Sequence, residues 1–292
     1  MYEGENRAAG ARISYFVNVP KKEEKKPEEK KDVTTPKVPS IKYDTVYAKI
    51  YNEVGKQIRT LFSVPDTSGM QRITWNLTEK GIRYPNTPKP KKGTAEPNGI
   101  NILSGKYKVV LSFGDQKDST YINVKPDPRY NFDRSAEVAK RDIYERLKVN
   151  VAKLTKATDR LTEANDVTEK LLNQVKDNEG KEIEDFRKQI KAVQDTIKSK
   201  KELIVAKPLE KQGYGRPYSM TALTKAQELM MYLGNRQFSP SKTESIILEQ
   251  FDGLTRDSIA KINVFFAGNW AEFRKKVESM KLNMFKDYEM IR

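Results

Sequence analysis

The chain has 292 residues, of which 37% are hydrophobic and 33% are charged, and its formal net charge is +15. This length suffices for two domains, and the composition suits small cores with long solvated helix faces. Cysteine and histidine are both absent, which excludes thiolate nucleophiles, disulfides, serine triads and the usual Cys- or His-ligated metal sites. Carboxylate-only or lysine-based chemistry stays open, but the composition favours a protein that is not an enzyme and holds no cofactor.

Positive residues alternate with Asp and Glu along almost the whole chain. The densest run, Lys21 to Asp32, holds six Lys against four Glu and one Asp. Because phosphate binding needs positive charge focused on one face, we expect solvated surface rather than nucleic-acid binding. No apolar run approaches the ~20 residues that span a bilayer, and the chain does not start with a basic-then-apolar leader. We therefore expect any export signal to have been removed or to lie upstream.

The first segment predicts a β-strand that is separated from later strands. Residues 11–19 alternate apolar and polar side chains, the period of a half-buried strand. We assign residues 1–20 to an N-terminal strand and junction segment and residues 21–40 to a linker rich in Lys, Glu and Pro. Such a strand either pairs with the next part of the chain or belongs to a domain whose boundary lies upstream.

Residues 41–127 read as all-β. Alternating runs separated by Gly- and Asp-containing turns predict strands over 44–51, 57–62, 71–77, 106–113 and 119–124. Several short strands of this kind are typical of an immunoglobulin-like β-sandwich. Trp75 is then the core tryptophan, with a sugar-stacking platform as the alternative.

A long connection, residues 78–103, interrupts the strands. Connections of this length inside a compact domain are either functional or without fixed structure. Its positive charge and apolar side chains make it the candidate contact surface of the sandwich, with partner contacts at Ile82, Arg83, Tyr84, Lys91 and Lys92. Tyr84 is also a candidate for glycan stacking.

After Asp127-Pro128-Arg129 the hydrophobic period changes from two to seven. A heptad seam predicts one straight helix over 133–177, and its positions are Leu147, Val151, Leu154, Thr158, Leu161, Asn165, Thr168, Leu172 and Val175. Asn178-Glu179-Gly180 ends this helix with a C-terminal glycine, and a second helix follows and ends before Pro208. Because the connection between them is short, the two helices should form an antiparallel hairpin.

The rest of the chain predicts more helix. A third helix covers 220–233, and a fourth comes after Ser239, taken as the N-cap, with Pro240 at the first helical position. Gly268-Asn269 interrupts the fourth helix, and an apolar stripe then continues to the end of the chain. Residues 128–292 therefore predict a helical bundle.

Motifs that carry chemistry are missing from the sequence. Gly213-Tyr214-Gly215 does not come after a strand, so it does not match a nucleotide-binding loop. The carboxylates of Glu182, Glu184 and Asp185 lie at a helix start, where the helix dipole favours negative charge. We predict no catalytic, cofactor or metal site.

Short motifs occur in the order found in one known family: Tyr2–Asn6 with Gly10–Tyr15, Asn52–Leu61, Thr74–Leu77, Ser104–Tyr107 and Asp127–Arg129. With these motifs the chain resembles the C-terminal region of secreted bacterial proteins with sortilin-like, BNR-repeat β-propellers, often labelled glycosyl hydrolases. In that family the propellers precede an Ig-like domain of the flagellar hook-cap type and a helical segment.

The resemblance implies export to the periplasm or cell surface of a Bacteroidetes-like bacterium. It also implies that the first strand leads from a propeller into the Ig-like domain. The chain departs from the family at Arg7 and Ala8, where a Pro-Pro is usual. The propellers hold any glycan site in that family and are absent here, so no catalytic residue carries over.

The sequence supports three hypotheses. The first is a non-catalytic protein-interaction or scaffold module of the cell envelope, with a protein partner or an upstream β-propeller. The second is a glycan-binding accessory module of a propeller enzyme that uses Trp75 or Tyr84. The third is a basic coiled-coil binder of nucleic acid.

Overall fold

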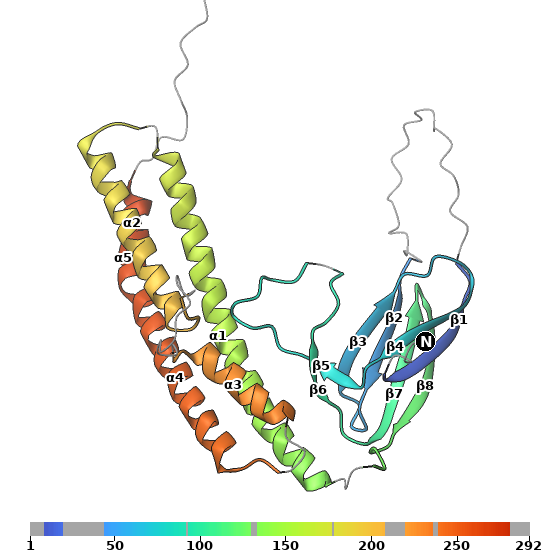
Figure 1. Cartoon of the computed structure of the whole chain (residues 1–292). Coiled ribbons are helices and arrows are strands. Elements are labelled where there is room, and N and C mark those ends of the chain that lie inside the picture. The colour runs from blue at the N-terminus through green and yellow to red at the C-terminus, as the bar shows by residue number, and fades with distance from the viewer. Residues whose placement is uncertain are drawn as a thin grey trace, which may run out of the picture. The chain divides into compact units, whose positions relative to one another are not determined.

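The structure, a computed structural model, describes residues 9–19, 44–91, 93–129, 133–176, 178–207, 220–235 and 239–280. An antiparallel β-sheet region is followed by helices (Figure 1), which confirms the predicted order. The chain divides into two compact units. The sheet unit comprises the described residues of Met1–Ile82 and Pro90–Arg134, and the helical unit those of Arg83–Lys89 and Ser135–Arg292.

All strand pairs of the sheet unit are antiparallel. A four-stranded sheet has the order β3 (Gln57–Ser63), β2 (Val46–Tyr51), β7 (Gly105–Phe113) and β8 (Gln116–Val124). Two further pairs join β1 (Ala11–Val17) to β4 (Gly69–Trp75) and β5 (Thr78–Lys80) to β6 (Asn98–Asn101).

Strand alternation builds one core in this unit. Along β2, Val46, Ala48 and Ile50 are buried while the residues between them face outward, as the two-residue period of a strand requires. The pairs β1–β4 and β2–β7 bury their apolar side chains in the same cluster, which contains Ile13, Tyr15, Val17, Val46, Ala48, Ile50, Ile58, Ile73, Trp75, Tyr107, Val109 and Phe113.

The first strand joins the sheet unit by pairing with β4. Ala11 lies opposite Trp75 and Val17 opposite Gly69, so this strand pairs with a later part of the chain, the first of the two alternatives. Gly10 immediately precedes β1 and has a φ of 116°. A Cβ at this position would lie 2.2 Å from the carbonyl oxygen of Trp75, so only glycine fits. The predicted linker, residues 21–40, lies outside the described residues.

Arg59 ties β3 to the β5–β6 pair. This residue is 5% exposed, and its guanidinium donates to the carbonyl oxygens of Glu79 (2.9 Å), Pro97 (2.6 Å) and Glu96 (3.1 Å) and to Oδ1 of Asn98 (2.8 Å). Burial lowers the pKa of Arg59, and the carboxylate of Glu96 opposes that shift. A buried guanidinium needs such a set of acceptors, so the base of the long connection is fixed.

The helical unit contains α1 (Arg134–Gln174), α2 (Lys181–Glu202), α3 (Ala222–Asn235), α4 (Lys242–Ala267) and α5 (Asn269–Ser279). Helix α4 contacts α3 and α5, and α2 contacts both α4 and α5 (Figure 1). The end of α1, α2 and α5 share a core of Val175, Phe186, Ile190 and Phe273. None of the helices in the described ranges is long and apolar enough to cross a membrane.

The heptad seam of α1 is largely buried. The structure buries Leu147, Val151, Leu154, Leu161, Thr168 and Val175. Thr158, Asn165 and Leu172 are only partly buried. The first helix thus forms where the seven-residue repeat predicts it, over 134–174 rather than 133–177.

One predicted helix start is wrong. The N-cap of α4 is Ser241 rather than Ser239, and its Oγ accepts a hydrogen bond from the backbone N–H of Thr243 (3.3 Å). The carboxylate of Glu244 accepts from the backbone N–H of Ser241 (2.9 Å), which completes a capping box. The Ser-x-x-Glu pattern identifies this cap better than the Ser-Pro pair. The predicted apolar stripe beyond residue 280 lies outside the described residues.

Candidate interaction surfaces

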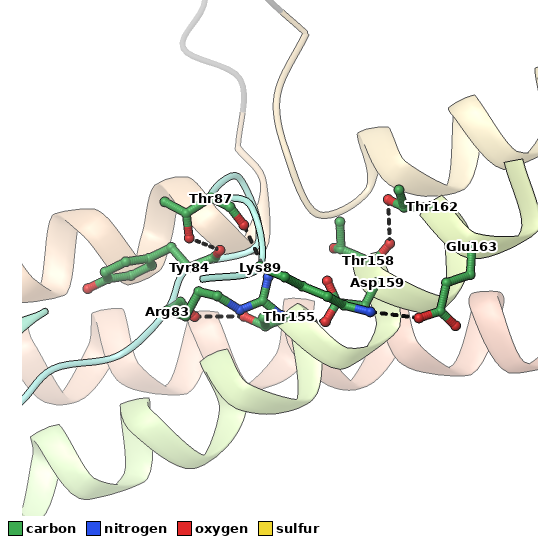
Figure 2. Close-up of polar contacts among 9 residues, drawn as sticks. All are labelled: Arg83, Tyr84, Thr87, Lys89, Thr155, Thr158, Asp159, Thr162 and Glu163. Atoms are coloured by element: carbon green, nitrogen blue, oxygen red, sulfur yellow. Dashed lines mark hydrogen bonds and ion pairs between the residues drawn. The ribbon is translucent and has the colours of Figure 1, made fainter. Parts of the chain in front are cut away.

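The middle of the long connection lies against α1 in the helical unit. We call Arg83–Lys89 the docked segment, because it belongs to that unit although it lies in the chain between β5 and β6. Its contacts on α1 are Thr155, Asp159 and Glu163, which are spaced by four residues and therefore lie on one face of the helix (Figure 2).

Three polar contacts hold the docked segment. The guanidinium of Arg83 pairs with the carboxylate of Asp159, and the hydroxyl of Thr155 donates to the carbonyl oxygen of Arg83 at 2.9 Å. Nζ of Lys89 lies 2.7 Å from Oε1 of Glu163. Within the segment, Thr87 donates to the carbonyl oxygen of Tyr84 from its backbone N–H (3.0 Å) and its hydroxyl (2.7 Å) (Figure 2), which makes a compact turn.

These contacts occupy part of the surface predicted from the sequence. Arg83 is paired, and Ile82 and Tyr84 are half-buried. Burial raises the pKa of the Tyr84 phenol, because the charged form is poorly solvated there. Lys91 is exposed, and Lys92 lies outside the described residues. Of the candidate partner contacts that the structure describes, Arg83 therefore faces the protein's own helix, and Lys91 is exposed.

Trp75 offers no face to a sugar, so the prediction that this residue could stack on a glycan is wrong. The side chain has 0% exposure, and its ring packs edge-on against Tyr107 with centroids 5.5 Å apart. Its Nε1 donates to the carbonyl oxygen of Thr78 at 2.9 Å, which satisfies the only polar group of the ring. Its side chain points inward from β4, so Trp75 is a core residue.

The outer face of the four-stranded sheet is open and carries a single sign of charge. We call it the basic-aromatic face, because it combines four lysines with four aromatic residues and contains no Asp or Glu. It consists of Tyr47, Lys49, Tyr51, Gln57, Thr60, Phe62, Lys106, Lys108, Val110, Ser112, Lys117, Ser119, Tyr121 and Asn123. None of these residues is buried.

The register places aromatic residues in two rows across this face. Phe62, Tyr47, Ser112 and Lys117 form one row, and Gln57, Tyr51, Lys108 and Tyr121 form the other. A row with Lys49 at its centre separates them. Tyr47 and Phe62 lie 6.4 Å apart between ring centroids. Ring surface and positive charge therefore alternate along β2, and the neighbouring strands add further rings and lysines to the same face.

A groove of about 660 Å³ opens at the Tyr51 end of the face. It is lined by Tyr51, Asn52, Glu53, Gly55, Lys106, Lys108, Val110 and Tyr121. Nζ of Lys106 lies 4.4 Å from the ring centroid of Tyr121, a cation–π contact. Glu53 is the one carboxylate of the lining, and its Oε1 accepts a hydrogen bond from the backbone N–H of Lys106 at 3.0 Å. The groove has the volume of a small-molecule site.

Sequence reasoning missed this face. Alternation within each strand indicates which side chains share a side, but the neighbours of β2 become known only with the sheet order. In the part of the chain that the structure describes, no group of three or more Asp or Glu side chains is placed to hold a metal ion. Comparison of the chain with protein-family models, curated proteins and solved structures finds no match. The surface geometry is therefore the basis for a functional proposal.

Proposed function

We propose that this protein is a non-catalytic interaction module that presents the basic-aromatic face to a partner in the bacterial cell envelope. The observation that carries the proposal is the face itself, in which four exposed lysines and four aromatic residues line one open side of a sheet. Aromatic residues are enriched at binding surfaces because one ring supplies large contact area. The helical unit serves as a scaffold.

We further propose that the sheet unit is an immunoglobulin-like β-sandwich and that α1 and α2 form an antiparallel hairpin within a bundle. Two observations support this architecture. The pairs β1–β4 and β2–β7 share one core, and only residues 175–180 separate α1 from α2. The resemblance to propeller-associated proteins supports placement in the periplasm or at the cell surface, where an upstream propeller is the expected neighbour.

Site-specific photo-crosslinking in the producing cells tests the proposed function. A photoreactive phenylalanine analogue replaces Tyr47 on the basic-aromatic face or Phe16 on β1, which is 72% exposed and serves as the matched control. We expect a defined conjugate from position 47, recovered in the envelope fraction, and little from position 16. Equal conjugates at both positions, or glycoside turnover by the purified chain, would contradict the proposal.

A further inference from the structure

We infer that the ligand of the basic-aromatic face is an acidic polysaccharide, a chain of sugar rings that bear carboxylate groups. This inference rests on the proposed function, because it names the class of partner for the same surface. It replaces the predicted stacking residues Trp75 and Tyr84 with Tyr47, Tyr51 and Tyr121, whose side chains lie on the open side of the sheet.

The charge of the face favours an anionic ligand. Lys49, Lys106, Lys108 and Lys117 supply four positive charges, and Glu53 at the groove supplies one negative charge, so the net charge is +3. Lys106 and Lys108 point to the same side from adjacent outward positions of β7, about 7 Å apart along the strand. A neutral glycan leaves these ammonium groups without partners, whereas a carboxylate on successive sugars pairs with them.

The aromatic and hydroxyl groups suit sugar rings. Tyrosine and phenylalanine rings provide flat apolar surfaces against which the C–H faces of sugars pack. Between them lie side chains that both donate and accept hydrogen bonds, as sugar hydroxyls do: Gln57, Thr60, Ser112, Ser119 and Asn123. Ring surface, hydroxyl partners and positive charge therefore occur together on one face.

Single-stranded nucleic acid is the competing anionic ligand. Proteins that bind it favour arginine, whose planar guanidinium stacks on bases and grips phosphate with two hydrogen bonds. No arginine lies among the residues of the basic-aromatic face, although Arg12 and Arg72 lie on the β1–β4 pair of the same unit with outward-facing side chains. The selective use of lysine, with five hydroxyl and amide side chains, favours the acidic glycan.

Calorimetric titration of the full chain tests this inference with three probes. They are polygalacturonate, its methyl-esterified form in which the carboxylates are neutral, and a single-stranded oligodeoxythymidine. We expect the acidic polymer to bind most tightly at low salt and to lose affinity as salt rises, because salt screens exposed charge pairs. The esterified polymer retains only the ring contacts and binds more weakly.

Variants of the face locate the binding site. Lys108→Gln should weaken polygalacturonate binding about fivefold, the upper range for one exposed ion pair. Tyr121→Ala should weaken the acidic and the esterified polymer alike, since it removes ring surface. Arg12→Gln and Phe16→Ala, on β1 of the same unit, are the matched controls for lost charge and lost ring, and they should leave both affinities unchanged.

Each alternative outcome overturns the inference in a recognisable way. If the oligonucleotide binds more tightly than polygalacturonate and the same face variants weaken that binding, the surface belongs to nucleic acid. If the control substitutions on β1 weaken binding as much as the face variants do, the binding reflects only the net charge of the protein. Absence of binding to all three probes, together with a protein conjugate from position 47, leaves the interaction module intact and removes the glycan as its ligand.

Discussion

At the scale of single residues, Arg59 holds together a dense set of hydrogen bonds within the sheet unit. Four oxygens from the β5–β6 region accept from one guanidinium. The adjacent backbone N–H of Thr60 donates to Oε2 of Glu96 at 2.8 Å. Because water cannot replace the guanidinium without opening this segment, the loss of Arg59 should be strongly destabilising.

Arg59→Met tests this role. We expect a loss of about 3 kcal/mol in unfolding free energy, because the buried acceptors lose their charged donor. Arg72→Met is the matched control, since Arg72 is exposed and donates to Ser14 across the β1–β4 pair at 3.2 Å. Urea denaturation followed by circular dichroism measures both, and equal small losses would contradict the role of Arg59.

Asp127 provides a pH-dependent prediction. Hydrogen bonds from the side chain and the backbone N–H of Arg129 lower its pKa from 3.8 to about 2. A lowered folded-state pKa means that this contact stabilises the fold fully above pH 3.8 and is lost as the pH falls toward 2. Carboxyl carbon chemical shifts should give a midpoint near 2. Arg129→Gln should raise it, and an unchanged midpoint would show that the guanidinium is not the cause.

At the scale of the secondary-structure element, the start of α4 separates two interpretations of the same sequence. Ser241→Ala should cost about 1 kcal/mol in unfolding free energy, because it removes the N-cap hydrogen bond. Ser239→Ala is the matched control, two residues earlier. Thermal denaturation of both variants measures the difference, and a larger effect at Ser239 would restore the Ser-Pro start.

The docked segment on α1 gives a second prediction at this scale. Asp159→Asn removes the charge that pairs with Arg83 and should raise the amide exchange rates of Tyr84, Asn86, Thr87 and Lys89 about fivefold, as expected for a partly exposed charged hydrogen bond. Asp166→Asn, at an exposed position on the same helix, should leave those rates unchanged. Hydrogen exchange followed by mass spectrometry distinguishes the two results.

The α1 helix and the four-stranded sheet also show how far sequence reasoning reaches. The seven-residue repeat of α1 reports burial against neighbouring helices, so Leu147, Val151 and Leu154 are predictable. Thr155 lies outside that repeat and is 6% exposed, because the docked segment covers it. Its burial depends on a contact 72 residues away. The basic-aromatic face could not be predicted from the sequence for the same reason, since β2 and β7 are distant in the chain.

At the scale of the whole molecule, each unit holds one of the two tryptophans. Trp75 lies in the core of the sheet unit and Trp270 packs beside Phe273 in the helical unit, with centroids 5.8 Å apart. Each residue can therefore report on its own unit when the other is replaced by phenylalanine.

We expect the two cores to respond separately to mutation. Phe186→Ala removes a buried ring from the α2 core, and it should destabilise the helical unit by about 4 kcal/mol. In a Trp75→Phe background, the fluorescence of Trp270 should show an earlier transition in urea. In a Trp270→Phe background, the fluorescence of Trp75 should show a much smaller change. Equal shifts at both tryptophans would mean that the units unfold as one.

The docked segment also bears on how the gene can be divided. Because Arg83–Lys89 belongs to the helical unit while its flanking strands belong to the sheet unit, neither unit corresponds to one uninterrupted stretch of coding sequence. A shortened gene that begins at the codon for Pro128 would encode α1 without the peptide that covers Thr155. Recombination at that codon would likewise split one compact unit, so a separately expressed helical fragment should carry residues 83–89 through a linker.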